Sequence, residues 1–179
     1  SFAKSYISGI LNHVSEITVV LNQWVNSYKR LVVGYEAPVY ISWARRNRSA
    51  LVRVPMYKPG KENATRIELR SPDPGCNPYL AFSMILAAGM EGVEKKFNFP
   101  NPIEEDIFMI DEENKKKKNI NSLPGSLIEA ISLFEKSELA KKTLGNHVFN
   151  KIIENKKIEW DKYRVQVTGY EIEKYLPIL

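Results

Sequence analysis

The chain is poor in the residues that most often carry catalysis or bind metals. Its 179 residues include one cysteine, Cys76, and two histidines, His13 and His147. A single cysteine cannot form an internal disulfide, which fits a reducing compartment, and we expect a cytoplasmic protein. Cys76 follows Gly75 in a proline-rich turn without an obvious histidine partner, so we do not expect a thiol nucleophile. The two histidines lie far apart in helical segments, where packed or surface roles are more common than metal binding.

Two kinds of sequence signal are also missing. There is no run of about 18 apolar residues, so we expect no membrane-spanning segment. No Walker-type or dinucleotide-binding glycine pattern is present, so any ATP site requires another design. Residue 1 is serine and no charged, then apolar, leader follows it, which is typical of a mature product or a piece of a longer chain.

The charge balance is moderately basic. The chain has 26 lysines and arginines against 21 acidic residues, a net charge of +5. Such a charge could attract nucleic acid. However, the densest basic run, "NKKKKN" at 114–119, has no interleaved aromatic residues, which a single-strand binder would need. We therefore predict a solvated loop here and no nucleic-acid partner.

Hydrophobic periodicity predicts an α+β chain whose character changes near residue 75. The strand-and-loop part, 1–75, is expected to contain a helix over 1–25, a loop over 26–38 and short strands at 39–43, 49–54 and 66–70. The helical part, 76–179, is expected to contain a buried helix over 79–97, a helix capped by Ser126 and a long helix over 145–176.

The stretch "RIELR" places charge on one side of a predicted strand. Side chains alternate between the faces of a strand, so Arg66, Glu68 and Arg70 share one face, and Ile67 and Leu69 share the other. Further arginines lie nearby in the sequence, at Arg30, Arg45, Arg46, Arg48 and Arg53. The arginine fork matches carboxylate and phosphate oxygens. The carboxylate could simply neutralise these arginines, or it could bind a hard divalent cation. Spacing alone leaves open a salt-bridged strand pair and a site for a metal, a carboxylate and a polyphosphate.

These residues also carry a resemblance to a known family. The stretches "NSYKRLVVGYEAPVYISWARRNRSALVRVP" (26–55) and "TRIELRSPDPGCNPYLAFSMILAAGMEGVEKK" (65–96) resemble the C-terminal part of the type I glutamine synthetase catalytic domain. "SLPGSLIEAI" and "IEWDKYRVQVTGYEIEKYL" continue the match, which covers essentially all 179 residues. The resemblance implies short antiparallel strands that form part of a catalytic barrel, followed by a helical C-terminal region.

The family joins ammonia to L-glutamate with ATP, through γ-glutamyl phosphate, and uses Mg²⁺ or Mn²⁺. The resemblance implies that Glu36 shields the intermediate and accepts a proton from ammonia, and that Arg48 contacts the phosphate. The substrate-binding residues that it implies are Arg30, Glu36, Arg48 and Arg70. The ATP-binding residues that it implies are Arg48, Arg53, Arg66 and Lys61, with Lys58 as an alternative to Lys61. Glu68 is implied to bind one of the paired metal ions.

The sequence departs from the family pattern in several places. Val33 replaces a proline of the flap but changes no charge. Phe108 stands where the subgroup controlled by adenylylation has a tyrosine, so we predict no adenylylation of this loop. The family's other carboxylates and its histidine come from upstream strands, and the N-terminal domain and the upstream half of the catalytic domain are absent here. We therefore predict that the isolated chain is inactive.

Partners and alternatives also follow from the resemblance. Full-length members form dodecamers, and "YEIEKYLPIL" at the C-terminus resembles the tail that reaches across their two rings. A ligase of the same fold could use an amine larger than ammonia, with the same metal and phosphate residues. A non-catalytic relative could retain the fold alone, although it would have no reason to keep the charged residues together.

Overall fold

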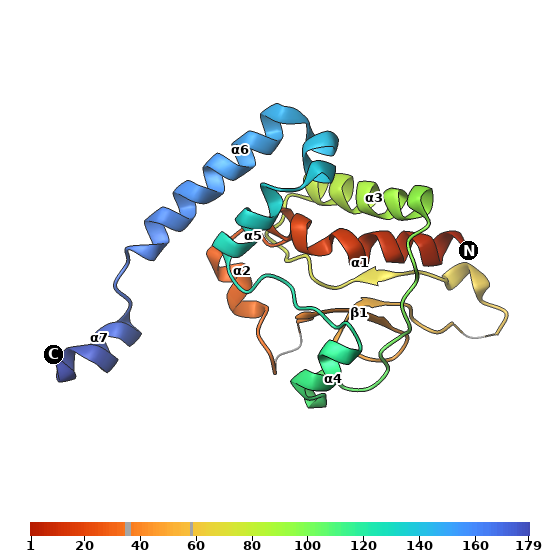
Figure 1. Cartoon of the computed structure of the whole chain (residues 1–179), viewed down its shortest axis with the longest axis horizontal. Helices are drawn as coiled ribbons and strands as arrows, with labels where there is room; N and C mark the ends of the chain where they lie inside the picture. Colours follow the sequence, from red (N-terminus) through yellow and green to blue (C-terminus); the bar gives the residue numbers. More distant parts are fainter. Residues whose placement is uncertain (35–36, 58) are drawn as a thin grey trace.

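The computed structural model describes residues 1–34, 37–57 and 59–179. Figure 1 shows a layered body in which α1 (Phe2–Leu21) lies between α3 (Pro78–Lys95) and a small sheet. The contacts of α1 with both layers make it the central element of the body.

Helix α1 forms because its apolar residues recur at helical spacing. Ile10, Val14, Ile17 and Leu21 are completely buried and lie on one stripe of the helix. The predicted helix over 1–25 is confirmed in its main part, but it ends at Leu21.

A short helix follows where the sequence predicted a loop. The segment 26–38 begins inside α2 (Val25–Arg30), so the loop prediction was wrong for its first residues. The backbone N–H of Trp24 donates to Ser27 Oγ at 3.1 Å, and the N–H of Ser27 donates to the Trp24 carbonyl at 3.0 Å. These bonds satisfy groups that the start of a helix otherwise leaves without partners.

Glycines allow α1 and α3 to approach until their backbones touch. A Cβ atom at Gly9 would lie 2.1 Å from the carbonyl oxygen of Ala88, and one at Gly92 would lie 2.3 Å from that of Ser5. Neither glycine could carry a side chain unless the two helices moved apart.

The sheet has three strands in the order β1 (Tyr40–Ala44), β2 (Ala50–Arg53), β3 (Glu68–Leu69). Strands β2 and β3 are antiparallel, with Arg53 opposite Glu68. Strands β1 and β2 are parallel, with Tyr40 opposite Ala50. The expected antiparallel set is therefore a mixed sheet, and the part of the chain that the structure describes shows no barrel.

A distant carboxylate binds the short connection between β1 and β2. The two strands are joined by only 45–49, a length typical of an antiparallel pair. Glu104 accepts hydrogen bonds from the backbone N–H groups of Arg45 at 3.0 Å and Arg46 at 3.2 Å. This contact holds the start of the connection outside the sheet, and the chain returns to the beginning of β1 before β2 starts.

The remaining helices are α4 (Glu112–Lys117), α5 (Leu127–Phe134), α6 (Glu138–Arg164) and α7 (Gly169–Tyr175), with 3₁₀ turns at Glu62–Ala64, Ile107–Met109 and Leu176–Ile178. The predicted cap is confirmed, because Ser126 Oγ accepts the N–H of Glu129 at 3.3 Å. The predicted helix over 145–176 is divided: α6 begins earlier, bends at Gly145 and ends at Arg164. None of the described helices is long and apolar enough to cross a membrane.

The lysine run at 114–119 is not the solvated loop that its composition predicted. Most of it is α4, whose first turn is capped by Asp111. Lys115 is buried, and its Nζ donates to the hydroxyl of Tyr40 at 2.9 Å and pairs with Glu112 at 2.8 Å. This lysine therefore attaches α4 to β1.

The C-terminal end extends away from the body in Figure 1. Helix α7 has no buried residue. Helix α7 and the residues on either side of it expose large apolar side chains at Val165, Val167, Tyr170, Ile172, Leu176, Ile178 and Leu179.

We predict that Gly92→Ala destabilises the fold, because the new methyl group would separate α1 from α3. The expected decrease in Tm is roughly 5 °C or more, as for an overpacked core. Thermal unfolding of the full-length polypeptide, followed by circular dichroism, measures it. Gly169→Ala is the matched control, since no atom lies within 4 Å of its added Cβ; equal Tm values for the two variants would contradict the prediction.

Candidate active site

Three of the predicted arginines line one open cavity of about 750 Å³. Arg53 comes from β2, Arg70 from the end of β3, and Arg48 from the connection between β1 and β2. The cavity is completed by Gly34, Asn47, Ser49, Glu104, Asp106 and Phe108. Three arginines and two carboxylates, Glu104 and Asp106, therefore share this space, and the excess positive charge suits an anionic ligand.

Glu68 lies beside this cavity between two arginines. Its Oε2 accepts from Arg53 Nε at 2.7 Å and lies 2.6 Å from Arg53 Nη2, and its Oε1 accepts from Arg66 Nε at 3.1 Å. Burial by itself raises the pKa of Glu68, but the hydrogen bonds and charges of Arg53 and Arg66 outweigh it, so the pKa lies below its usual range. The carboxylate stays ionised and neutralises part of the arginine charge.

The alternation predicted for "RIELR" is confirmed by these contacts. The charged side chains at 66 and 68 meet each other, while Ile67 and Leu69 pack against the hydrophobic core. Arg70 Nη1 donates to the carbonyl oxygens of Arg48 and, at 3.3 Å, Ala50. The guanidinium of Arg70 thereby connects the end of β3 to the loop that carries Arg48.

Sequence reasoning missed the residues that hold this loop in place. Asn47 Nδ2 donates to the carbonyl oxygens of Ile103, at 3.0 Å, and Glu105, at 2.5 Å. Its Oδ1 accepts from both the N–H and the hydroxyl of Ser49, at 2.8 and 2.7 Å. Asn47 thus fixes the backbone on both sides of Arg48. The only signal for Asn47 in the sequence was its position inside the arginine-rich run. That position does not reveal its bond to Ile103, 56 residues away.

Arg30 lies in a different place. It lines a separate pocket of about 250 Å³ with Asp73 and Trp24, and it is absent from the lining of the arginine cavity. Its Nη2 donates to Asn22 Oδ1 at 3.3 Å and to the carbonyl of Ser71. Among the described residues, Arg30 Nε, Asn22 Nδ2 and Ser71 Oγ are buried without a hydrogen-bond partner. Buried polar groups of this kind mark a place where a polar ligand or water completes the bonding.

The other predicted residues are placed as follows. Glu36 and Lys58 lie outside the described residues. Lys61 is exposed on a loop and does not line the arginine cavity. Arg66 is also outside the cavity lining, although it contacts Glu68.

Metal binding would need ligands beyond those found here. Within 1–34, 37–57 and 59–179, no three His, Cys, Asp or Glu residues form a group that could hold a metal ion. Glu68 offers one carboxylate, whose oxygens now accept hydrogen bonds from arginines. One carboxylate can contribute to a Mg²⁺ or Mn²⁺ site but does not make one.

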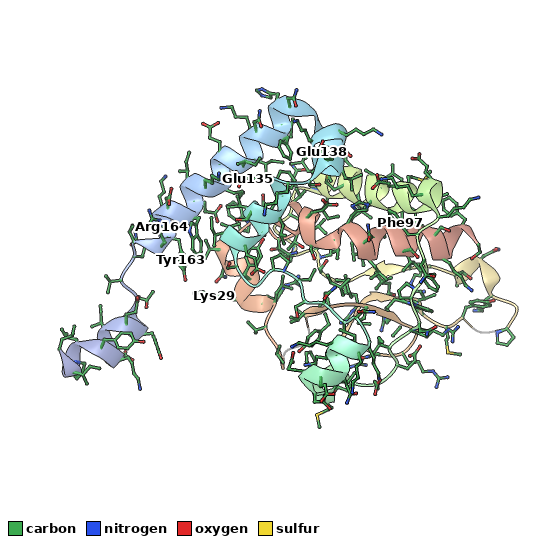
Figure 2. All side chains as sticks on the ribbon, in the orientation of Figure 1. Lys29, Phe97, Glu135, Glu138, Tyr163 and Arg164 are labelled. Atoms are coloured by element: carbon green, nitrogen blue, oxygen red, sulfur yellow. The ribbon has the colours of Figure 1, made fainter. Side chains whose placement is uncertain are left out.

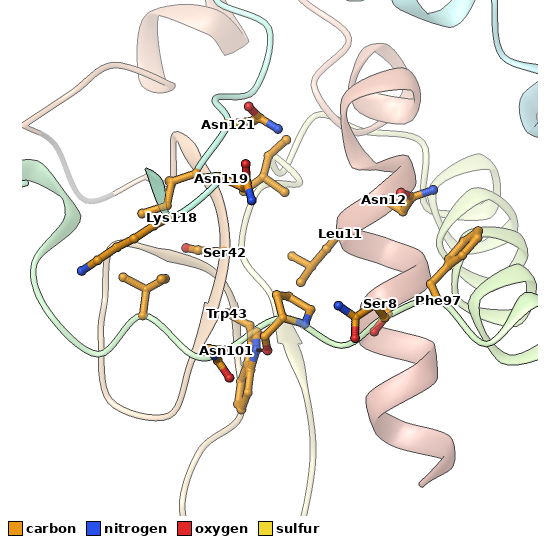
Figure 3. A pocket seen from close by; sticks show the side chains of 15 residues that line it. Ser8, Leu11, Asn12, Ser42, Trp43, Phe97, Asn101, Lys118, Asn119 and Asn121 are labelled. Carbon is orange, nitrogen blue, oxygen red and sulfur yellow. Dashed lines mark hydrogen bonds between the residues drawn. The ribbon is translucent and has the colours of Figure 1, made fainter. Parts of the chain in front are cut away.

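Another pocket, of about 350 Å³, differs in its chemistry from the arginine cavity and from the pocket of Arg30 (Figure 3). It lies between α1 and the segments near residues 100 and 120, and side-chain amides dominate its polar lining. None of the predicted site residues lines it. The arginine cavity is therefore the candidate active site.

Comparisons with known proteins identify the family of the chain. Residues 1–175 match the family described as "Glutamine synthetase, catalytic domain". The chain belongs to this family. It is 51% identical over 176 residues to the glutamine synthetase of Mycolicibacterium smegmatis, and 52% identical over 172 residues to that of Methanocaldococcus jannaschii.

Solved structures of the same fold confirm the backbone arrangement. A GmaS–ADP complex matches with a TM-score of 0.84 and 31% identity over 98% of this chain, and ligand-free GmaS with a TM-score of 0.81 and 31% identity over 98%. These matches cover 40% and 38% of the GmaS chains. The two glutamine synthetases are matched over 98% and 96% of this chain but only 40% and 37% of their own lengths. The chain thus spans about two fifths of the curated glutamine synthetases.

We predict that Glu68→Gln lowers stability at neutral pH and that the difference disappears in acid. A carboxyl with a lowered folded pKa stabilises the fold above its unfolded pKa, about 4.3, and this contribution is lost as the pH falls through the folded value. Thermal unfolding of the full-length polypeptide with EDTA, between pH 7 and pH 3, measures the difference in Tm.

The control for this prediction is Glu113→Gln, which removes a largely exposed pair with Lys117. It should change Tm very little at any pH. A wild-type advantage over Glu68→Gln that persisted or grew towards pH 3 would show that the carboxylate charge is not the cause.

Proposed function

We propose that a full-length polypeptide carrying this chain is a glutamine synthetase, which ligates ammonia to L-glutamate at the expense of ATP through γ-glutamyl phosphate. The observation that carries this proposal is the convergence of Arg48, Arg53 and Arg70 on one cavity, with Glu68 beside them. Phosphoryl transfer depends on charge neutralisation and positioning more than on covalent chemistry by the protein. This wall provides fixed positive charge.

The residues of the wall would contact different ligands. Arg48, Arg53 and Arg66 would contact the phosphates and the nucleotide, with Lys61 as a further ATP contact. Arg70 would contact the substrate at the same wall. Glu68 would be one ligand of Mg²⁺ or Mn²⁺, which when bound neutralises phosphate charge. The hydrogen bonds of Glu68 to arginines keep its carboxylate ionised, the form that a cation binds.

Arg30 would bind a carboxylate of glutamate. Its side chain is partly anchored, but Nε and the neighbouring Asn22 Nδ2 are buried donors without a protein partner among the described residues. The fork of a guanidinium matches the two oxygens of a carboxylate, and Arg30 lines an open pocket. Glu36 would accept the proton that ammonium must lose before nitrogen can attack the acyl phosphate.

The chain by itself would be inactive, because it supplies one wall of the site. The other metal-binding carboxylates and the histidine would come from the upstream part of the polypeptide, and further residues from a neighbouring subunit. A dodecamer would also give the exposed apolar residues of the C-terminal segment a partner surface.

We predict that the full-length polypeptide forms glutamine from glutamate, ammonium, ATP and Mg²⁺, and that Glu68→Ala lowers kcat/KM at least about 100-fold. The value falls because the variant would lose one metal ligand and the counter-charge for Arg53. Glutamine is measured by chromatography, with Glu113→Ala as the control for removal of an exposed carboxylate.

The identity of the amine substrate is tested with the same polypeptide by measuring ATP consumption. Consumption of ATP with methylamine or ethylamine, but not with ammonium, would replace the proposal with a γ-glutamyl-amide ligase. Absence of turnover with every amine would indicate a non-catalytic relative.

A further inference from the structure

One lysine of α6 is buried although it carries a charge. The side chain of Lys156 is only 8% exposed, and its Nζ pairs with Glu159 Oε2 at 2.8 Å. The same Nζ lies 4.4 Å from the centre of the Trp24 ring, within the range of a cation–π interaction. On the same helix, Lys151 and Glu154 form a pair of equal spacing whose side chains are more than half exposed. The Lys156–Glu159 pair therefore differs from the exposed pair in its contact with Trp24, the residue before α2.

Glu159 connects this ion pair to the first residue of α2. Its second oxygen, Oε1, accepts the backbone N–H of Val25 at 3.2 Å. This N–H belongs to the first turn of a helix and has no partner within the helix. The two members of the pair thus hold adjacent residues, Trp24 through its ring and Val25 through its backbone.

Trp24 is confined on its other side by the turn that follows β3. A Cβ atom at Gly75 would lie 2.7 Å from Trp24 Nε1, so the indole occupies the space where a side chain would be. Asp73 in the same turn accepts from the hydroxyl of Ser27 and, at 2.8 Å, from the N–H of Gly75. The indole contacts both α6 and this turn, remains 47% exposed, and lines the same pocket as Arg30.

A second contact joins the far end of α2 to α6. Lys29 Nζ lies 5.7 Å from the ring centre of Tyr163, and Figure 2 shows these two side chains between α2 and the last turns of α6. Arg30 is the next residue and the last of α2. Both ends of this six-residue helix are therefore supported by α6.

We propose that Lys156 and Glu159 are positioning residues for the amino-acid substrate. They fix Trp24 and the start of α2, and α2 in turn fixes the guanidinium of Arg30 against Asn22 and the carbonyl of Ser71. The inference rests on the proposed role of Arg30 in binding glutamate. Neither residue lines the cavity that contains Arg48, Arg53 and Arg70, so the nucleotide side of the site should not depend on them.

The test uses the full-length polypeptide with Lys156→Met, which keeps most of the volume and removes the charge, and Glu159→Gln, which removes the counter-charge. L-Glutamate affinity is measured by isothermal titration calorimetry, and the KM values for glutamate and ATP are measured from glutamine formation. We expect glutamate Kd and KM to rise about tenfold, because a small displacement of a binding group is costly, and the KM for ATP to stay within about twofold.

Matched variants separate positioning from general damage. Lys156→Arg keeps a cation over Trp24, so this variant should retain wild-type glutamate affinity. Lys151→Met and Glu154→Gln remove the exposed pair of the same helix and should leave both KM values unchanged. If glutamate binding stays at the wild-type level in Lys156→Met and Glu159→Gln, or if both KM values rise together with a lower Tm, the inference is wrong.

An Arg30→Lys variant separates this inference from the proposed function. Wild-type glutamate affinity in Arg30→Lys would overturn the inference, because the positioned group would not be a glutamate ligand. The opposite split is also possible. If the wild-type protein forms no glutamine, but Arg30→Lys, Lys156→Met and Glu159→Gln all bind glutamate more weakly than it does, the inference is supported and the proposed function is wrong.

Discussion

Electrostatic repulsion between arginines is the constraint on which the candidate site depends. Arg48, Arg53 and Arg70 face one cavity, and like charges so close together destabilise a fold unless they are neutralised or tied to the backbone. Glu68 neutralises Arg53, and the carbonyls of Arg48 and Ala50 hold Arg70. Glu68 thus offsets part of the positive charge, whereas the carbonyl oxygens hold Arg70 in place without removing its charge.

The rest of the molecule keeps this wall in place. Close packing of α1 on α3, with glycines where the backbones touch, provides a rigid layer behind the sheet. Asn47 and Glu104 join the loop of Arg48 to the segment at 103–105, far away in the sequence. A site that binds a polyphosphate needs such preorganised donors, because donors that must reorganise contribute less to catalysis.

Arg30 belongs to a second rigid unit made of α2, the turn at 71–75 and α6. The two units meet at Ser71, whose carbonyl accepts from Arg30 and which directly follows Arg70 of the arginine wall. In the proposed reaction Arg30 would bind the amino acid from this unit, while Arg70 would contact it from the arginine wall. Helix α6 contacts both ends of α2, the helix that carries Arg30.

The sequence by itself determined the family, the α+β composition and the charged face of "RIELR", because long motifs and side-chain alternation are local properties. The cap at Ser126 is local in the same way. Tertiary structure alone decided the parallel pairing of β1 with β2, since a connection as short as 45–49 is typical of an antiparallel hairpin. It also decided that Lys115 and Lys156 are buried while similar lysines beside them are exposed. Each buried lysine pairs with a glutamate three residues away and lies over an aromatic ring from a distant segment, Tyr40 or Trp24. The nearby glutamates can be found in the sequence, but the distant rings cannot.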